Sequence, residues 1–309
     1  MFYHMRGDEK MTVTEYLESL LDEEKISEEE KEKIRKKRDE VETAIREEFG
    51  NKIKTVKYSG SIAKHTAINS SKDLDLAIHF KKESFDSLKE MYDSVFDFLK
   101  DNYNVRKQKV SIGLSDFNVD VVPGRRIDEE DESNNDVFLY RSDNDSRIKT
   151  NIEIHKSHIK ESGCRSVIKL MKIWKNKWNV KFKSFALELL VIQALNDSSK
   201  TGLKDRTKEV LEYIVENIET INLIDPANSN NNVADVIEDY KKLFMKTTAS
   251  NCLSYLDDAD EDPESQLSAW KKVFNDFSGS GGTNNNYTSS SIVKRNTTDW
   301  GRQPDRRHG

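Results

Sequence analysis

The run DLDLAIHF at residues 73–80 constrains the fold more than any other stretch of this sequence. Successive side chains of a β-strand point to opposite faces, and here polar and apolar residues alternate. The side chains of Asp73 and Asp75 would therefore point outward from the same face of a strand. The other face would carry four apolar side chains, those of Leu74, Leu76, Ile78 and Phe80. The pattern predicts a strand that holds two carboxylates on a rigid, apolar support.

Two carboxylates held two residues apart suit a divalent cation. Mg²⁺ takes oxygen ligands and completes its coordination shell with waters and substrate phosphates. Gly60 and Ser61 precede the strand at a short distance and suit a phosphate. A glycine lets the backbone approach a phosphate closely, and the serine adds a hydroxyl beside main-chain N–H donors. The sequence thus predicts a combined metal and phosphate site.

This pattern of Gly-Ser, a polar spacer and Asp-x-Asp on a strand resembles the signature of the polymerase-β-like nucleotidyltransferases. That signature includes a third carboxylate on a later strand. Asp120 matches it in the run FNVDVV at 117–122, and we expect Pro123-Gly124 to close that strand. The run VDVVPG at 119–124 is similar to a subgroup, the bacterial cyclic-oligonucleotide synthases of anti-phage signalling. The resemblance implies an α/β fold, with a mixed β-sheet core, a helical lobe and an active-site cleft between them.

The resemblance also implies the chemistry of the site. Three aspartates would be both catalytic residues and ligands of two Mg²⁺ ions, with Mn²⁺ as a possible substitute: Asp73, Asp75 and Asp120. One ion would activate the attacking hydroxyl, and the other would stabilise the departing pyrophosphate. The substrates would be nucleoside triphosphates such as ATP.

Two residues further along the chain match positions at which the family that this sequence resembles contacts phosphate. They are Lys172, in VIKLMKIWK, and Ser184, in KSFALELL. Ser184 also reads as an ordinary helix N-cap, and the two roles are compatible because a helix N-terminus is itself an anion site. The nucleotide-binding set implied by the resemblance is Gly60, Ser61, Lys172 and Ser184. A later stretch, Asp225-Pro226-Ala227-Asn228, resembles a family loop and equally suits a purely structural turn.

Composition limits where such a protein works and what it binds. The net charge is −6 with 34% charged residues, so there is no overall basic bias toward nucleic acid. A local basic segment does occur, because residues 147–183 hold eleven Lys or Arg against two Glu. The chain has two cysteines and no run of eighteen apolar residues. We expect a soluble protein of the reducing cytoplasm, without a membrane span.

Three segments are expected along the chain. Residues 1–160 would hold N-terminal helices, at 12–21 and 27–49, and the nucleotidyltransferase core, with a strand at 53–59 and a helix capped by Ser84. Residues 161–277 would form the helical lobe and end in helices at 234–247 and 265–277. Residues 278–309 are rich in Gly, Ser, Thr and Asn, which predicts a disordered tail. The tail ends at Gly309, and the resemblance suggests capture by a ubiquitin-transfer-like partner enzyme; a frayed end is the alternative.

Three functions remain open at this point. The first is a nucleotidyltransferase that joins nucleoside triphosphates into a cyclic or linear oligonucleotide second messenger, sensed by an effector protein. The second is an RNA-directed enzyme of the poly(A) or CCA-adding kind, which the basic segment permits and the absence of an additional RNA-binding domain weakens. The third is a non-catalytic binding module on the same fold, against which the three retained carboxylates count.

Overall fold

The computed structural model describes residues 10–72, 74–131 and 133–277. In this part of the chain, a mixed sheet of seven strands has the order β1-β2-β5-β4-β3, with β6 paired to β5 and β7 to β6. β2 and β5 run parallel, and the other neighbours are antiparallel. The strands are β1 (Ile53–Ser59), β2 (Leu74–Phe80), β3 (Val105–Lys107), β4 (Ile112–Leu114), β5 (Val119–Arg126), β6 (Val137–Arg141) and β7 (Ser146–Thr150).

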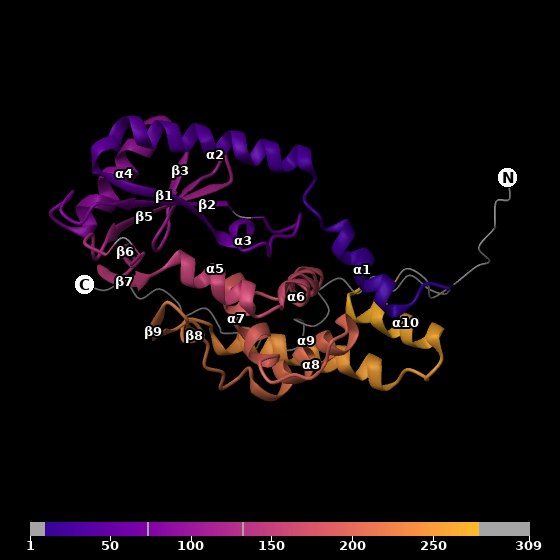
Figure 1. Cartoon of the computed structure of the whole chain (residues 1–309). Coiled ribbons are helices and arrows are strands. Elements are labelled where there is room, and N and C mark those ends of the chain that lie inside the picture. Colours follow the sequence, from indigo (N-terminus) through magenta and orange to yellow (C-terminus); the bar gives the residue numbers. More distant parts are fainter. Residues whose placement is uncertain (1–9, 73, 132, 278–309) are drawn as a thin grey trace, which may run out of the picture. The chain divides into compact units, whose positions relative to one another are not determined.

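One face of this sheet carries the first hydrophobic core. The four apolar residues expected on one side of residues 74–80 are all buried there, which confirms the predicted alternation. Helices α2 (Glu28–Phe49) and α4 (Leu88–Asn102) cover this face, whereas α3 (Gly60–Ala63) and α5 (Ile152–Glu161) lie on the other side in Figure 1. His79, on the opposite face, is also buried. The C-terminal end of β2 is therefore covered on both faces, not on one as the alternation alone suggests.

A second hydrophobic core joins the remaining helices. It includes the large side chains of Trp174 and Trp270, both fully buried. α1, the first helix in the described residues, packs into this core through Tyr16, Leu17 and Leu20. The elements concerned are α1 (Val13–Glu23), α6 (Arg165–Lys177), α7 (Ser184–Ala194), α8 (Leu203–Asn217), α9 (Asp239–Asp257) and α10 (Pro263–Val273). The hairpin of β8 (Ile224–Asp225) and β9 (Asn228–Asn232) lies between α8 and α9 in the chain.

The ends of three helices, α4, α9 and α10, differ from expectation. α4 begins at Leu88, and its N-cap is Ser87, whose hydroxyl accepts from Glu90 N at 3.0 Å. The expected cap, Ser84, instead donates to the carbonyl of Lys81 at 2.6 Å and so stabilises the preceding turn. The closing helices also shift, to 239–257 and 263–273.

The strand that carries Asp120 does not end at Pro123-Gly124 as expected. β5 continues to Arg126, with Pro123 opposite Ile78 in the register with β2. A proline inside a sheet is tolerated where no ladder hydrogen bond needs its missing N–H. Here β5 pairs with β4 before Pro123 and with β6 after it, so the proline lies at the change of partner.

The predicted fold class is confirmed: a mixed α/β protein with a mixed sheet and a helical part. None of the helices in the described ranges is long and apolar enough to cross a membrane. The tail predicted at residues 278–309, including Gly309, lies outside the described residues.

Candidate active site

The structure brings two of the three predicted aspartates side by side. Asp75 on β2 is the register partner of Asp120 on β5. Paired residues of parallel strands point to the same face, and here that face is opposite the first hydrophobic core. Ser59, at the end of β1, pairs with Asp75 from the other side. Asp73 directly precedes β2 and lies outside the described residues.

Asp120 is held in place by a small polar network. Gln108 Nε2 donates to Asp120 Oδ1 at 2.9 Å, and Ser111 Oγ donates to Gln108 Oε1 at 3.1 Å. Gly113 is the register partner of Asp120 on β4. A Cβ at Gly113 would lie 2.6 Å from Gln108 Nε2 and 3.0 Å from Asp120 Oδ1, so only glycine leaves room for this contact. The sequence offered no signal for Gln108 or Gly113.

Gly60 and Ser61 are the first two residues of α3, at the turn that directly follows β1. Gly60 has a φ of 74°, which glycine adopts without strain. Ser61 is 7% exposed, and its Oγ is buried without a hydrogen-bond partner among the described residues. A buried hydroxyl without a partner costs free energy. A ligand oxygen at this position would satisfy it.

Lys172 lies in a buried network instead of a pocket. Its side chain is 1% exposed, and its Nζ donates to Glu188 Oε1 at 2.7 Å and to Thr66 Oγ1 at 3.1 Å. Lys64 donates to the other oxygen of Glu188. Burial alone would raise the pKa of the Glu188 carboxyl, but the charges and hydrogen bonds of the two lysines hold it below its usual value. The network is therefore ionic.

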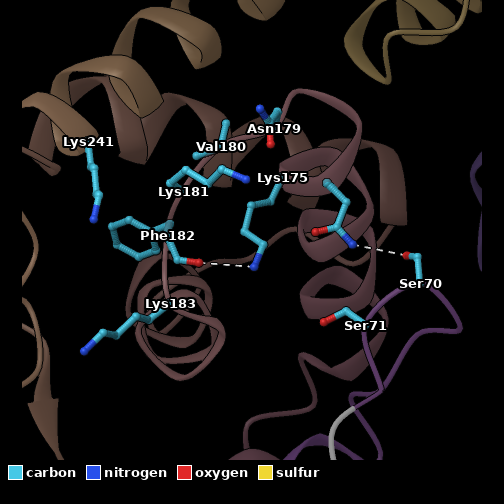
Figure 2. Close-up of a pocket in the computed structure, with 10 residues that line it drawn as sticks. Ser70, Ser71, Lys175, Asn179, Val180, Lys181, Phe182, Lys183 and Lys241 are labelled. Carbon is cyan, nitrogen blue, oxygen red and sulfur yellow. Dashed lines mark hydrogen bonds between the residues drawn. The ribbon is translucent and has the colours of Figure 1, made fainter. Parts of the chain in front are cut away.

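A pocket of ≈ 550 Å³ opens between the segment before Asp73 and the connection from α6 to α7 (Figure 2). Its described lining holds four lysines and no acidic residue. Lys175 reaches it, donating to the carbonyl of Phe182 at 3.1 Å and to Ser184 Oγ at 3.5 Å. The lining residues are Ser70, Ser71, Lys175, Asn176, Asn179, Val180, Lys181, Phe182, Lys183 and Lys241.

Positive charge is concentrated around this pocket. Partial burial lowers the pKa of Lys183, and the nearby cations Lys109 and Lys241 lower it further. An anion in the pocket would relieve this repulsion. Ser184 is the first residue of α7, whose N-cap is Lys183 and not Ser184 as expected, and its Oγ lies 3.5 Å from Nζ of the pocket residue Lys175. Sequence reasoning missed Lys175, although it lies three residues after Lys172 and thus near it on the same helix.

The loop at Asp225 has a structural explanation. Asp225 Oδ1 lies 2.7 Å from Nε2 of His155 on α5 and accepts from Ala227 N at 2.9 Å. Burial alone would raise the pKa of Asp225, but the hydrogen bond to His155 keeps it below its usual value. The β8–β9 hairpin is thereby attached to α5.

A Gly-Ser turn beside paired aspartates on neighbouring strands of a mixed sheet is the arrangement of a polymerase-β-like nucleotidyltransferase fold. Comparison with known proteins narrows this class. Residues 11–156 match the family of the Second Messenger Oligonucleotide or Dinucleotide Synthetase domain, SMODS. Over these residues, the chain is similar to that domain.

Two curated relatives agree with this assignment. The Cyclic AMP-AMP-AMP synthase of Escherichia coli strain MS 115-1 is 26% identical over 271 residues, which are 70% of this chain and 80% of that protein. The CBASS oligonucleotide cyclase CdnC of Escherichia coli strain KTE188 is 23% identical over 280 residues, which are 76% and 87% of the two chains.

Solved structures show the same fold. The structure of E. coli MS115-1 CdnC with ATP matches with a TM-score of 0.68 at 21% identity, over 84% of this chain and 97% of that one. The complex of the same enzyme with HORMA-deltaN matches at 0.65, with 84% and 96% coverage and 21% identity. A STING-associated CdnE c-di-GMP synthase from Capnocytophaga granulosa matches at 0.57, with 15% identity and 86% of each chain covered.

Proposed function

We propose that this protein condenses nucleoside triphosphates into a cyclic oligonucleotide second messenger for anti-phage defence and releases pyrophosphate. The observation that carries this proposal is the register pairing of Asp75 with Asp120 inside a SMODS domain. The names of the relatives, a cyclic AMP-AMP-AMP synthase and an oligonucleotide cyclase, support the same product class.

The carboxylates suit divalent cations. Asp73, Asp75 and Asp120 would hold Mg²⁺, or Mn²⁺ in its place. These ions prefer oxygen ligands, and carboxylates supply them. Bound there, a divalent ion lowers the pKa of the attacking hydroxyl and neutralises charge on the phosphates. In the described ranges no three His, Cys, Asp or Glu side chains lie close enough together to hold a metal ion, and Asp73 is outside those ranges. Asp73, two residues before Asp75 in the sequence, would complete the set.

The remaining residues of the site would act on the triphosphate. The Ser61 hydroxyl, which has no hydrogen-bond partner among the described residues, and the Gly60 backbone, which has no side chain beside it, suit one end of the phosphate chain. Lys175 and Ser184, 3.5 Å apart at the pocket edge, suit the other end. Lys172 was predicted for this role, and its buried position favours an indirect contribution through Glu188. Asp120, held by Gln108, would also accept the proton of the attacking hydroxyl.

Protein partners are part of the proposal. An effector protein would sense the product. The E. coli relative has been solved in a complex with HORMA-deltaN, which supports a protein partner here too. Both cysteines are free and buried, which suits action in the reducing cytoplasm. Conjugation of Gly309 by a ubiquitin-transfer-like enzyme stays a prediction. Deleting the last residues and finding conjugation intact would contradict it.

The test is product analysis. The protein is incubated with the four ribonucleoside triphosphates and Mg²⁺ or Mn²⁺, with and without a HORMA-domain protein, and then treated with phosphatase. We expect a phosphatase-resistant compound whose mass identifies its nucleotides. In a parallel reaction with RNA, elongation of the RNA instead would favour the tailing enzyme.

The matched control is the double variant Asp73→Ala with Asp75→Ala. We expect it to abolish the product, by about a thousandfold or more, because both ligands are lost. Its circular dichroism spectrum should remain that of the wild type. Full activity in this variant would refute the metal-site assignment.

A further inference from the structure

We propose that Glu188 is a positioning residue for nucleotide binding: its carboxylate fixes the Gly60-Ser61 turn against the two helices that carry Lys175 and Ser184. The proposal rests on the proposed function and deepens it. Glu188 is fully buried in α7, inside the otherwise apolar run ALELLVI. A lone acidic residue in such a run is the sequence signal that could have drawn attention to it.

Glu188 receives hydrogen bonds from two different parts of the chain. Lys64 donates to Oε2, and Thr66 Oγ1 donates to Oε1 at 2.6 Å; both come from the segment just after the Gly-Ser turn. Lys172 on α6 donates to Oε1 at 2.7 Å. A single carboxylate thus joins the segment after β1 to both α6 and α7.

The network is directly connected to the residues proposed to contact phosphate. The amide of Thr66 donates to the carbonyl of Ser61 at 2.9 Å, so the position of Thr66 fixes that of the Ser61 backbone. Lys172 precedes Lys175 by three residues on α6, and Ser184 precedes Glu188 by four on α7. Residues three or four apart are neighbours on one helix face. A shift of Glu188 would therefore alter the spacing between Ser61 on one side and Lys175 and Ser184 on the other.

The charges argue for a role beyond stability. One buried carboxylate faces two ammonium groups, with exposed fractions of 0% for Glu188, 1% for Lys172 and 9% for Lys64. Burying ions is costly, and an apolar cluster of similar volume often stabilises a protein as well or better. The positive charges of Lys64 and Lys172 lie next to the turn where phosphates are proposed to bind. A site that fixes geometry and favours an anion accounts for both features.

The experiment measures nucleotide binding and stability together. Thermal unfolding of the full chain is followed with and without α,β-methylene-ATP and Mg²⁺, and the KM for ATP and kcat are measured on the active protein. In Glu188→Gln, the amide keeps the shape and loses the charge. We expect the KM to rise about tenfold or more with kcat changed less, because misplaced phosphate contacts weaken binding. We also expect the nucleotide-induced rise in Tm to fall to less than half of the wild-type value.

The control separates positioning from stability. Ile214→Ala removes a fully buried side chain of α8, outside the site. It should lower Tm but leave the nucleotide-induced rise and the KM unchanged. A Glu188→Gln protein that behaves like Ile214→Ala, with a lower Tm and a wild-type nucleotide response, would overturn the proposal.

A second variant tests the proposal even if Glu188→Gln does not fold. Thr66→Val removes only the hydrogen bonds of the Thr66 hydroxyl and leaves all three charges in place. It should raise the KM in the same direction by a smaller factor, and a wild-type KM with a wild-type nucleotide response would count against the proposal. If the wild type itself shows neither product nor nucleotide-induced stabilisation, the proposed function fails. If nucleotide stabilises the wild type and the variants show the same KM and the same nucleotide-induced rise in Tm, only the role of Glu188 is refuted.

Discussion

At Gly113, the addition of a single methyl group should disturb the site. In Gly113→Ala the new methyl group would lie 2.6 Å from Gln108 Nε2 and 2.8 Å from Arg106 Nε, and Gln108 must then move away from Asp120. Residues that orient a metal ligand typically contribute ten- to a hundredfold. We expect activity to fall by about that factor, with a higher Mg²⁺ concentration needed for half-maximal rate, as a metal titration would measure.

The control for Gly113 is another glycine. Gly50 has nothing within 4 Å of an added Cβ, so Gly50→Ala should leave the Mg²⁺ titration unchanged. If Gly113→Ala keeps the wild-type rate and the wild-type Mg²⁺ requirement, Gln108 does not orient Asp120.

His79 gives the protein a predictable sensitivity to acid. Burial lowers its pKa to about 4, and the cations Lys57 and Arg126 contribute, with Glu153 opposing them. In the unfolded chain the pKa returns to about 6.5, so the unfolded state binds the proton more readily. Stability should therefore be lost as the pH falls from about 6.5 to about 4. This contribution amounts to about 3 kcal/mol at its full extent.

Urea unfolding at a series of pH values measures this effect. His79→Gln cannot titrate, so its free energy of unfolding should fall less between pH 7 and pH 4.5 than that of the wild type. Parallel curves for His79→Gln and the wild type would contradict the prediction.

At the scale of one element, α6 places two lysines in different environments one turn apart. Lys172 is buried against Glu188, whereas Lys175 lines the pocket. Lys172→Met should lower the free energy of unfolding by about 3 to 5 kcal/mol, because it removes one partner of a buried charge network. Lys175→Met should raise the KM for the triphosphate about tenfold or more, with a smaller loss of stability.

Denaturant unfolding and steady-state kinetics on the two variants separate these effects. Lys177, on the same helix and at its C-terminal end, provides a control outside the pocket lining, and Lys177→Met should change neither quantity appreciably. The assignment would be wrong if Lys175→Met lost stability while Lys172→Met changed only the KM.

Sequence patterns were most informative where a segment's own residues fix its structure. The strand at 53–59 and the alternation at 74–80 depend on local periodicity, and both are confirmed. Ser84 failed as a cap because its hydroxyl has a local alternative at Lys81, three residues earlier. Pro123 ended the strand in the prediction because residue type does not show that β5 changes partners there.

At the scale of the whole molecule, the candidate site depends on contacts between distant segments. The pairing of Asp75 with Asp120 was implied by a resemblance, and periodicity alone could not have placed the two strands side by side. The choice between Lys172 and Lys175 could not be made from residue type, because both are lysines on one short helix. It depends on Glu188, Lys64 and Thr66, which come from two other elements.

The position of α1 in the second hydrophobic core affects the order of folding. Its partners, α6, α8 and α10, end with Val273, near the far end of the described chain. During synthesis, the strands and helices of the sheet can assemble first, while Tyr16, Leu17 and Leu20 still lack their final neighbours. Contacts that join such distant residues slow folding, because a long loop must close before they form. α1 leaves the ribosome before all three of these partners and is thus among the last of these helices to reach its final neighbours, so its apolar face stays exposed to aggregation until then.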